Sequence, residues 1–272
     1  MEARAKTVES GTQFEVEVYP VTKSGHRRDG VSRYSAEAQR QYKKRLAAKK
    51  LVRLVNTNFT RGDIIITLTY RAELRPALNY KAVLRDTQNY FLAVKRYRKK
   101  NGLPELRYIS VIELTGRDNW HVHIIMSAID RDVAESLWKY SAFVNSKIFQ
   151  PTDQDGGAAF ANYIAGKKSG KESQTVGRNW NCSKNLVQPT VTTKPCKQTR
   201  AQIARLARQR IDDSAYWERR YKGYRFVSAR AVFNEYNGWW YLYVQMYRLA
   251  PLAPVRSCPY PKPNKAATRA RC

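Results

Sequence analysis

Two β-rich runs joined by a short polar turn, between residues 107 and 127, constrain the fold of this chain more than any other feature. The segment reads RYISVIELTGRDNWHVHIIMS, with aliphatic and aromatic residues on both sides of Gly-Arg-Asp-Asn at 116–119. Such runs flanking a polar turn that contains glycine predict an antiparallel β-hairpin. The fold must therefore contain an antiparallel sheet.

The sequence around this hairpin predicts further elements of the same domain. IIITLTY, at 64–70, is a continuous run of apolar and β-branched residues, typical of a strand that is covered on both faces. Helices and one more strand are expected at 76–100 (helix from Pro76, ending at Asn101-Gly102), 129–140 (helix), 144–149 (strand) and 156–168 (helix). This order predicts an α+β fold with a central antiparallel sheet flanked by helices.

The two ends of the chain differ in character from this region. Residues 1–55 are expected to form a basic N-terminal arm, with a short alternating piece at Phe14, Val16 and Val18 and a helix from Ser35. After a core over 56–186, residues 187–250 predict a basic helix and aromatic strands that turn at Asn237-Gly238. Residues 251–272 are expected to form a proline-rich basic tail. The sequence thus predicts a basic arm and a β-rich C-terminal extension around one core.

The charge of the chain indicates a polyanionic partner. Lys and Arg number 50 against 22 Asp and Glu, a formal net charge of +28. Three basic clusters, at 40–53, 95–100 and 194–210, contain no acidic residue. Nucleic acid is the first expectation, because each neutralised phosphate releases a condensed counterion, and an anionic membrane surface is the second.

The same composition argues against several classes of protein. No run of eighteen apolar residues and no apolar N-terminal segment occurs, so we expect an intracellular protein with no membrane partner. The four cysteines contain no CxxC pair, which favours free thiols over a zinc knuckle or a disulfide framework.

His121 and His123 lie two positions apart on the second predicted strand of the hairpin, so both side chains point to one face. Glu113 falls opposite His123 if the loop has five residues, 116–120, which places Thr115 opposite His121. A loop one residue shorter would turn Glu113 away, so this register stays open. Two imidazoles and a carboxylate suit metal-assisted chemistry, whereas two half-buried strand histidines are the structural alternative.

Tyr163 lies on the helix predicted after the sheet, with Lys167 one turn later and Lys168 beside it. A tyrosine is a poor nucleophile unless a polarised phosphate or a cation assists it. Among 18 tyrosines, one near a lysine indicates packing as readily as catalysis.

In order and content, these elements resemble the HUH single-strand endonucleases, specifically the rolling-circle replication initiators of plasmids and small phages. The resemblance rests on ITLTY at 66–70, on HVH at 121–123 preceded by VIEL, and on the later tyrosine helix. It covers residues 60–170, with a weaker echo in GRNWNCSKNL at 177–186.

The resemblance implies an HUH, RRM-like palm that carries Mg²⁺ or Mn²⁺ on His121, His123 and Glu113. It also implies that Tyr163 attacks single-stranded origin DNA, stays linked to the 5′ phosphate and frees a 3′ hydroxyl that primes rolling-circle replication, before the ends are rejoined. Lys167 would hold the phosphate or stabilise the tyrosinate. Many relatives place this lysine three residues after the tyrosine, where this chain has Gly166, so Lys167 or Lys168 must substitute.

No GxxxxGK[ST] phosphate loop is present, so we expect a host helicase and polymerase as partners. The expected location is the cytoplasm, at the nucleoid, or the host cytoplasm if a phage encodes the protein. A transposase or relaxase with the same chemistry and a zinc hydrolase are the rival enzymes. The non-enzymatic alternative is a basic nucleic-acid-binding protein whose Trp239, Trp240, Tyr241 and Tyr243 stack on bases.

Overall fold

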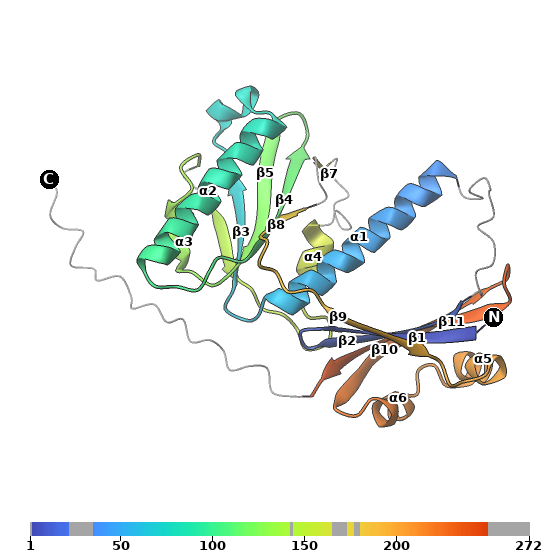
Figure 1. Cartoon of the computed structure of the whole chain (residues 1–272). Helices are drawn as coiled ribbons and strands as arrows, with labels where there is room; N and C mark the ends of the chain where they lie inside the picture. Colours follow the sequence, from blue (N-terminus) through green and yellow to red (C-terminus); the bar gives the residue numbers. More distant parts are fainter. Residues whose placement is uncertain (1, 22–34, 142–143, 165–172, 177–179, 250–272) are drawn as a thin grey trace, which may run out of the picture. The chain divides into compact units, whose positions relative to one another are not determined.

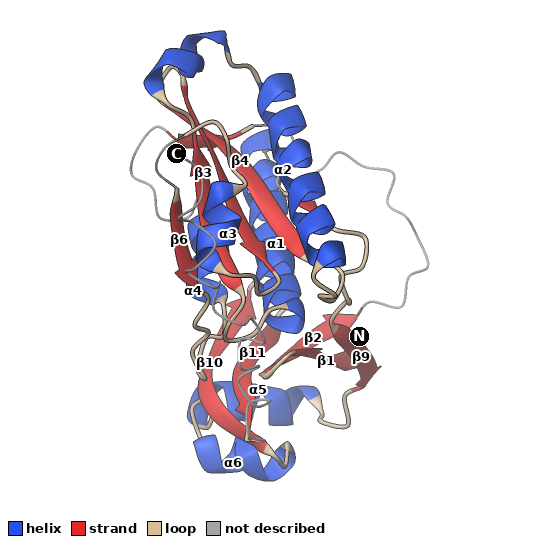
Figure 2. Cartoon of the chain, turned by 90° about the vertical axis from the view of Figure 1, so that its left-hand side faces the viewer, coloured by secondary structure: helices blue, strands red, loops and turns tan. Residues whose placement is uncertain are grey.

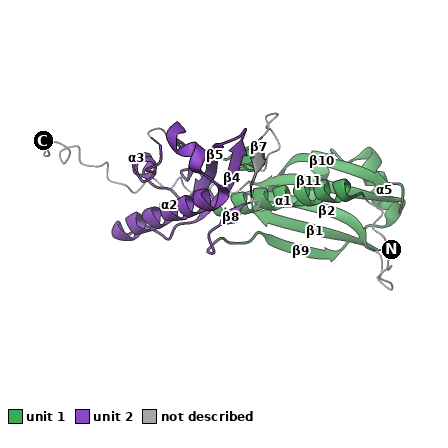
Figure 3. Cartoon of the chain, turned by 90° about the horizontal axis from the view of Figure 1, so that it is seen from above, with its two compact units in different colours: residues 1–58, 151–167, 186–252 green, residues 59–150, 168–185, 253–272 purple. Residues whose placement is uncertain are grey.

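The computed structural model describes residues 2–21, 35–141, 144–164, 173–176 and 180–249. The chain divides into two compact units, coloured separately in Figure 3. Unit 1 comprises residues 1–58, 151–167 and 186–252, and unit 2 comprises residues 59–150, 168–185 and 253–272. This grouping differs from the expected sequence of arm, core, extension and tail, because unit 1 draws on both ends of the chain. The tail expected over residues 251–272 lies outside the described residues.

Unit 2 is built on an antiparallel sheet whose strand order is β6-β3-β5-β4-β7, with β8 also pairing with β4. The strands are β3 (Ile64–Thr69), β4 (Tyr108–Thr115), β5 (Asn119–Met126), β6 (Asn145–Ile148), β7 (Ser173–Thr175) and β8 (Asn181–Cys182). The first run, IIITLT, is an internal strand with buried side chains on both faces, which confirms the prediction for it.

One face of this sheet packs against α2 (Tyr80–Lys100), as Figure 1 shows. Val83, Tyr90, Phe91 and Val94 recur at helical spacing and join the alternate apolar residues of β3, β4 and β5 in one core. The short α3 (Arg131–Ser136) adds Ala134 to the same core. Because this face is filled by helices, functional side chains of the hairpin must lie on the other face.

Two helix boundaries differ from the predictions. Pro76 lies inside a separate 3₁₀ helix, η1 (Ala72–Ala77), and α2 begins only at Tyr80, where the Asn79 side chain accepts a hydrogen bond from Ala82 N. An N-cap asparagine satisfies an amide that the first helical turn leaves unpaired, which sets the start of the helix. The helix predicted at 129–140 is limited to α3, capped by Asp130.

Unit 1 is built on a second antiparallel sheet, of order β10-β11-β2-β1-β9, shown in Figure 2. Its strands are β1 (Glu2–Ser10), β2 (Gln13–Val21), β9 (Thr190–Pro195), β10 (Tyr224–Asn234) and β11 (Trp239–Arg248). The hairpin of β10 and β11 turns at Gly238, whose φ is 65°, as expected. Phe14, Val16 and Val18 of β2 lie opposite Met246, Val244 and Leu242 of β11.

These apolar residues face α5 (Arg200–Gln209) and α6 (Ser214–Arg220), which contribute Ile203, Leu206, Ala207 and Trp217 to a second core. The other face of the sheet carries Glu15 and Glu17, which pair with Lys49 and Arg53 of α1 (Ala36–Asn58). The helix α4 (Ala158–Ile164) packs on α1.

The α+β class is confirmed, with two antiparallel sheets. The arm expected over residues 1–55 instead contributes two strands and a helix to unit 1. The alternating apolar residues of β2 need a partner strand and a helical cover, and the C-terminal segment supplies both. Among the described residues, no helix has the length and apolar composition needed to cross a membrane.

Candidate active site

The β4–β5 hairpin brings Glu113 directly opposite His121. Thr115 pairs with Asn119, so the loop contains only residues 116–118, with Gly116 at a φ of 65°. The predicted five-residue loop, with Glu113 opposite His123, is therefore wrong. Because the loop is shorter by two residues, and side chains alternate with period two, Glu113 nevertheless stays on the face that carries both histidines.

On this face, both imidazoles point their Nε2 atoms at one carboxylate oxygen. The Nε2 atoms of His121 and His123 lie 3.3 and 3.2 Å from Glu113 Oε2. One ligand atom from each residue lies within 4.8 Å of the other two, and no second group of three His, Cys, Asp or Glu ligands occurs in the described part of the chain. The structure thus brings together the three residues that the sequence suggested as a metal site.

The Nδ1 atoms of the two rings are held from behind. His121 Nδ1 lies 3.2 Å from the backbone oxygen of Asn119, and His123 Nδ1 lies 3.1 Å from the hydroxyl of Thr67 on β3. A carbonyl oxygen only accepts, so His121 carries its proton on Nδ1 and leaves the Nε2 lone pair for a ligand. Contacts of this kind orient metal-binding histidines in proteins.

Sequence reasoning missed both of these supporting groups. Thr67 lies opposite His123 in the β3–β5 register, so the polar threonines of an otherwise apolar strand were a usable signal. The contribution of Asn119 is a backbone oxygen, which any residue at that position would supply, and the sequence carries no signal for it.

Glu113 is almost completely buried yet ionised. Burial by itself raises the pKa of its carboxyl, but hydrogen bonds and charge interactions with His121 and His123 outweigh this and bring the pKa to about 2. His123 is only 3% exposed, and Glu113 only 7%. A buried carboxylate beside two imidazole lone pairs is a donor set that fits a divalent metal ion.

Tyr163 lies on α4, in unit 1, whereas the Glu113–His121–His123 group belongs to unit 2. The phenol is 50% exposed, so solvent and a substrate can reach it. Lys167 and Lys168 lie outside the described residues. The structure therefore places Tyr163 on a helix, as predicted, and leaves the lysine roles as predictions.

Residues 63–169 match the family model of the replication-associated protein ORF2. The matched stretch contains Glu113, His121, His123 and Tyr163. The match supports a replication-initiator family and a role in DNA replication. No curated protein and no solved structure matches the chain.

Proposed function

We propose that this protein is a single-tyrosine nickase that initiates rolling-circle replication. The observation that carries the proposal is the buried Glu113–His121–His123 group, which lies within the segment that matches a replication-associated family. The net charge of +28 supports a nucleic-acid substrate.

In this proposal, His121, His123 and Glu113 hold a divalent cation, Mg²⁺ or Mn²⁺. When bound, the cation supplies positive charge that polarises the scissile phosphate and stabilises the charge developing on it. Thr67 and Asn119 keep the imidazole rings oriented, so that little reorganisation is needed on binding.

Tyr163 is the nucleophile. Its phenolic oxygen loses the proton to solvent or a nearby base and forms a bond to the phosphorus of a phosphodiester in single-stranded origin DNA. The bond from phosphorus to the 3′ oxygen breaks, and that oxygen takes up a proton to become the 3′ hydroxyl that primes synthesis. The 5′ phosphate stays on Tyr163, so the bond energy is conserved, and attack by a 3′ hydroxyl rejoins the ends.

Lys167 is proposed to hold the phosphate or to stabilise the tyrosinate. The basic clusters position the DNA, and a host helicase and polymerase unwind and extend it. In a transposase or relaxase with the same site, the chemistry would be the same and only the DNA recognised would differ.

The test is incubation of the purified protein with labelled single-stranded DNA from its own replicon and Mn²⁺ or Mg²⁺, followed by denaturing electrophoresis. Tyr163→Phe is compared with Tyr236→Phe, a matched control because Tyr236 is 96% exposed in the β10–β11 turn. We expect a metal-dependent protein–DNA adduct in the wild type and in Tyr236→Phe, and none in Tyr163→Phe.

An adduct that persists in Tyr163→Phe would move the nucleophile to another residue. Tight binding without cleavage of any origin fragment would instead favour the non-enzymatic nucleic-acid-binding protein.

A further inference from the structure

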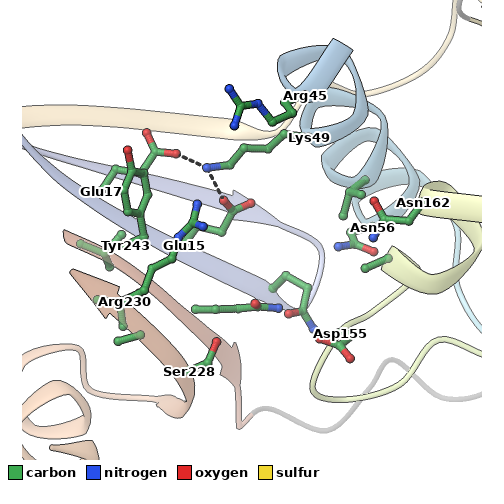
Figure 4. Close-up of a pocket in the computed structure, with 17 residues that line it drawn as sticks. Glu15, Glu17, Arg45, Lys49, Asn56, Asp155, Asn162, Ser228, Arg230 and Tyr243 are labelled. Atoms are coloured by element: carbon green, nitrogen blue, oxygen red, sulfur yellow. Dashed lines mark hydrogen bonds and ion pairs between the residues drawn. The ribbon is translucent and has the colours of Figure 1, made fainter. Parts of the chain in front are cut away.

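Unit 1 contains a polar groove between α1, α4 and the sheet face that carries Glu15 and Glu17, shown in Figure 4. Its volume is about 600 Å³, within the range of about 300–1,000 Å³ typical of ligand pockets. Every residue that lines it belongs to unit 1. We call it the α1 groove.

The acidic residues of the α1 groove are neutralised within the protein. Glu15 accepts two hydrogen bonds from Arg53, at 2.9 and 2.8 Å, and Lys49 forms ion pairs with both Glu15 and Glu17. The ring of Tyr243 lies between the Lys49 ammonium, 5.6 Å from its centroid, and the Arg230 guanidinium, at 4.7 Å. Glu15 and Glu17 therefore do not repel an anionic ligand as free carboxylates would.

The other polar groups of the groove are uncommitted. Arg45 and Arg230 make no hydrogen bond or ion pair with any residue that the structure describes, and the side chains of Asp155, Asn162 and Ser228 likewise have no such partner within the described ranges. Two guanidinium groups, an amide and a carboxylate thus line one cavity with their hydrogen-bonding capacity unused.

These groups separate into two ends. Arg45 and Asn56 are eleven positions apart on α1, which corresponds to about 16 Å along the helix axis. Arg45 marks the cationic end, whereas Asn56 lies beside the α4 end, because its Oδ1 accepts a hydrogen bond of 2.7 Å from Gly157 N. Asp155 and Asn162 belong to this second end.

We propose that the α1 groove binds nucleotides of a single DNA strand, with phosphates at Arg45 and Arg230 and a base at Asp155 and Asn162. Guanidinium groups match phosphate oxygens with paired hydrogen bonds. A carboxylate accepts from the amino groups of bases, and an amide both donates and accepts, so the second end suits a base edge and disfavours a phosphate.

This site deepens the proposed nicking function and rests on it in one respect. Asn162 lines the groove and directly precedes Tyr163 on α4. A strand that leaves the base end of the groove therefore passes the helix that carries the proposed nucleophile. The groove would hold DNA that flanks the scissile phosphate and so select the nucleotide that reaches Tyr163.

Binding is tested without catalysis, on the full chain carrying Tyr163→Phe, in the presence of EDTA. A fluorescein-labelled single-stranded oligonucleotide of mixed sequence is titrated by anisotropy, and deoxynucleoside monophosphates are tested as competitors. Arg45→Gln removes the exposed cation of the groove, and Asn162→Ala removes the amide. Arg219→Gln is the control, because it loses the same charge from the exposed end of α6, which packs on the opposite face of the sheet.

We expect Arg45→Gln and Asn162→Ala each to weaken oligonucleotide binding by roughly tenfold, and Arg219→Gln by less than about twofold. Equal affinity in all three variants would overturn the proposal. Effective competition by monophosphates, lost in Arg45→Gln, would assign the groove to free nucleotides instead of a DNA strand. Because no cleavage is measured, these outcomes do not depend on Tyr163 being the nucleophile.

Discussion

At the residue scale, the metal group depends on one hydroxyl that is not itself a ligand. Thr67 lies opposite His123 on β3, and its Oγ1 is 3.1 Å from His123 Nδ1. This contact fixes the ring so that Nε2 faces Glu113. A ring without the contact would be free to rotate or to change tautomer, and either change misdirects the lone pair.

Replacing Thr67 with valine should therefore weaken metal binding by about tenfold to a hundredfold. Mn²⁺ affinity, measured by isothermal titration calorimetry on the full chain, provides the test. Thr67→Ser keeps the hydroxyl and should bind Mn²⁺ within about threefold of the wild type. If valine and serine behave alike, the hydroxyl has no role in orienting His123.

The residue types of this site could be read from the sequence, but their exact partners could not. The His-x-His spacing and an acidic residue on the neighbouring strand were sufficient to suggest the three members. The pairing of Glu113 with His121 depends on a loop whose length the turn residues do not determine, because Gly116, Asp118 and Asn119 suit loops of several lengths.

At the element scale, the C-terminal end of α1 is fixed at a single residue, Asn56. Its backbone oxygen lies against the β1–β2 turn, so a Cβ at Gly11 would be 2.0 Å from it. Its side chain lies against Gly156, just before α4. Three elements that are distant in the sequence thus meet around one asparagine.

Gly11→Ala should destabilise the protein by more than about 3 kcal/mol, because the added methyl group collides with backbone and the φ of 61° disfavours any side chain. Gly223→Ala is the matched control, since Gly223 has a φ of 86° with no atom within 4 Å of the added Cβ. It should cost only about 1–2 kcal/mol. Thermal unfolding compares the two variants, and similar losses would mean that Asn56 yields to the methyl group.

Element types were easier to predict than element boundaries. The apolar periodicity of α2 is a property of its whole length, and it was visible in the sequence. The start of α2 instead depends on Asn79, a single polar residue that competes with Pro76 as a helix start, so the sequence admitted both. Similarly, the alternation in β2 was visible, but its partner β11 lies more than two hundred residues away.

At the scale of the whole chain, the buried charges make stability depend on pH. Burial raises the pKa of Glu15, but its hydrogen bond and charge interactions with Arg53 and Lys49 outweigh this and hold the pKa below its usual value of 4.5. The pKa of Glu17 is lowered in the same way, mainly by Lys49. A carboxyl whose pKa is depressed on folding stabilises the native state above its unfolded pKa.

This stabilisation should be complete above about pH 5 and should disappear as the pH falls through the lowered pKa of Glu15 and Glu17. Glu15→Gln should lower the free energy of unfolding by about 2 kcal/mol at pH 7 and by much less at pH 3. Urea titrations across this range provide the measurement. Glu9→Gln removes a more exposed ion pair to Arg248 and should change stability by less than about 0.5 kcal/mol. A pH-independent loss in Glu15→Gln would contradict the assignment.

The pairing of β2 with β11 also determines when each unit can fold during synthesis. Residues 13–18 must wait for residues 242–247 before the sheet of unit 1 can close, whereas the strands of unit 2 are all present once residue 182 has been made. A ribosome that stops early would therefore release a chain whose metal-binding hairpin has its complete sheet but whose first strands lack their partners. The part of the protein that supplies β2 with a partner is also the last to be made.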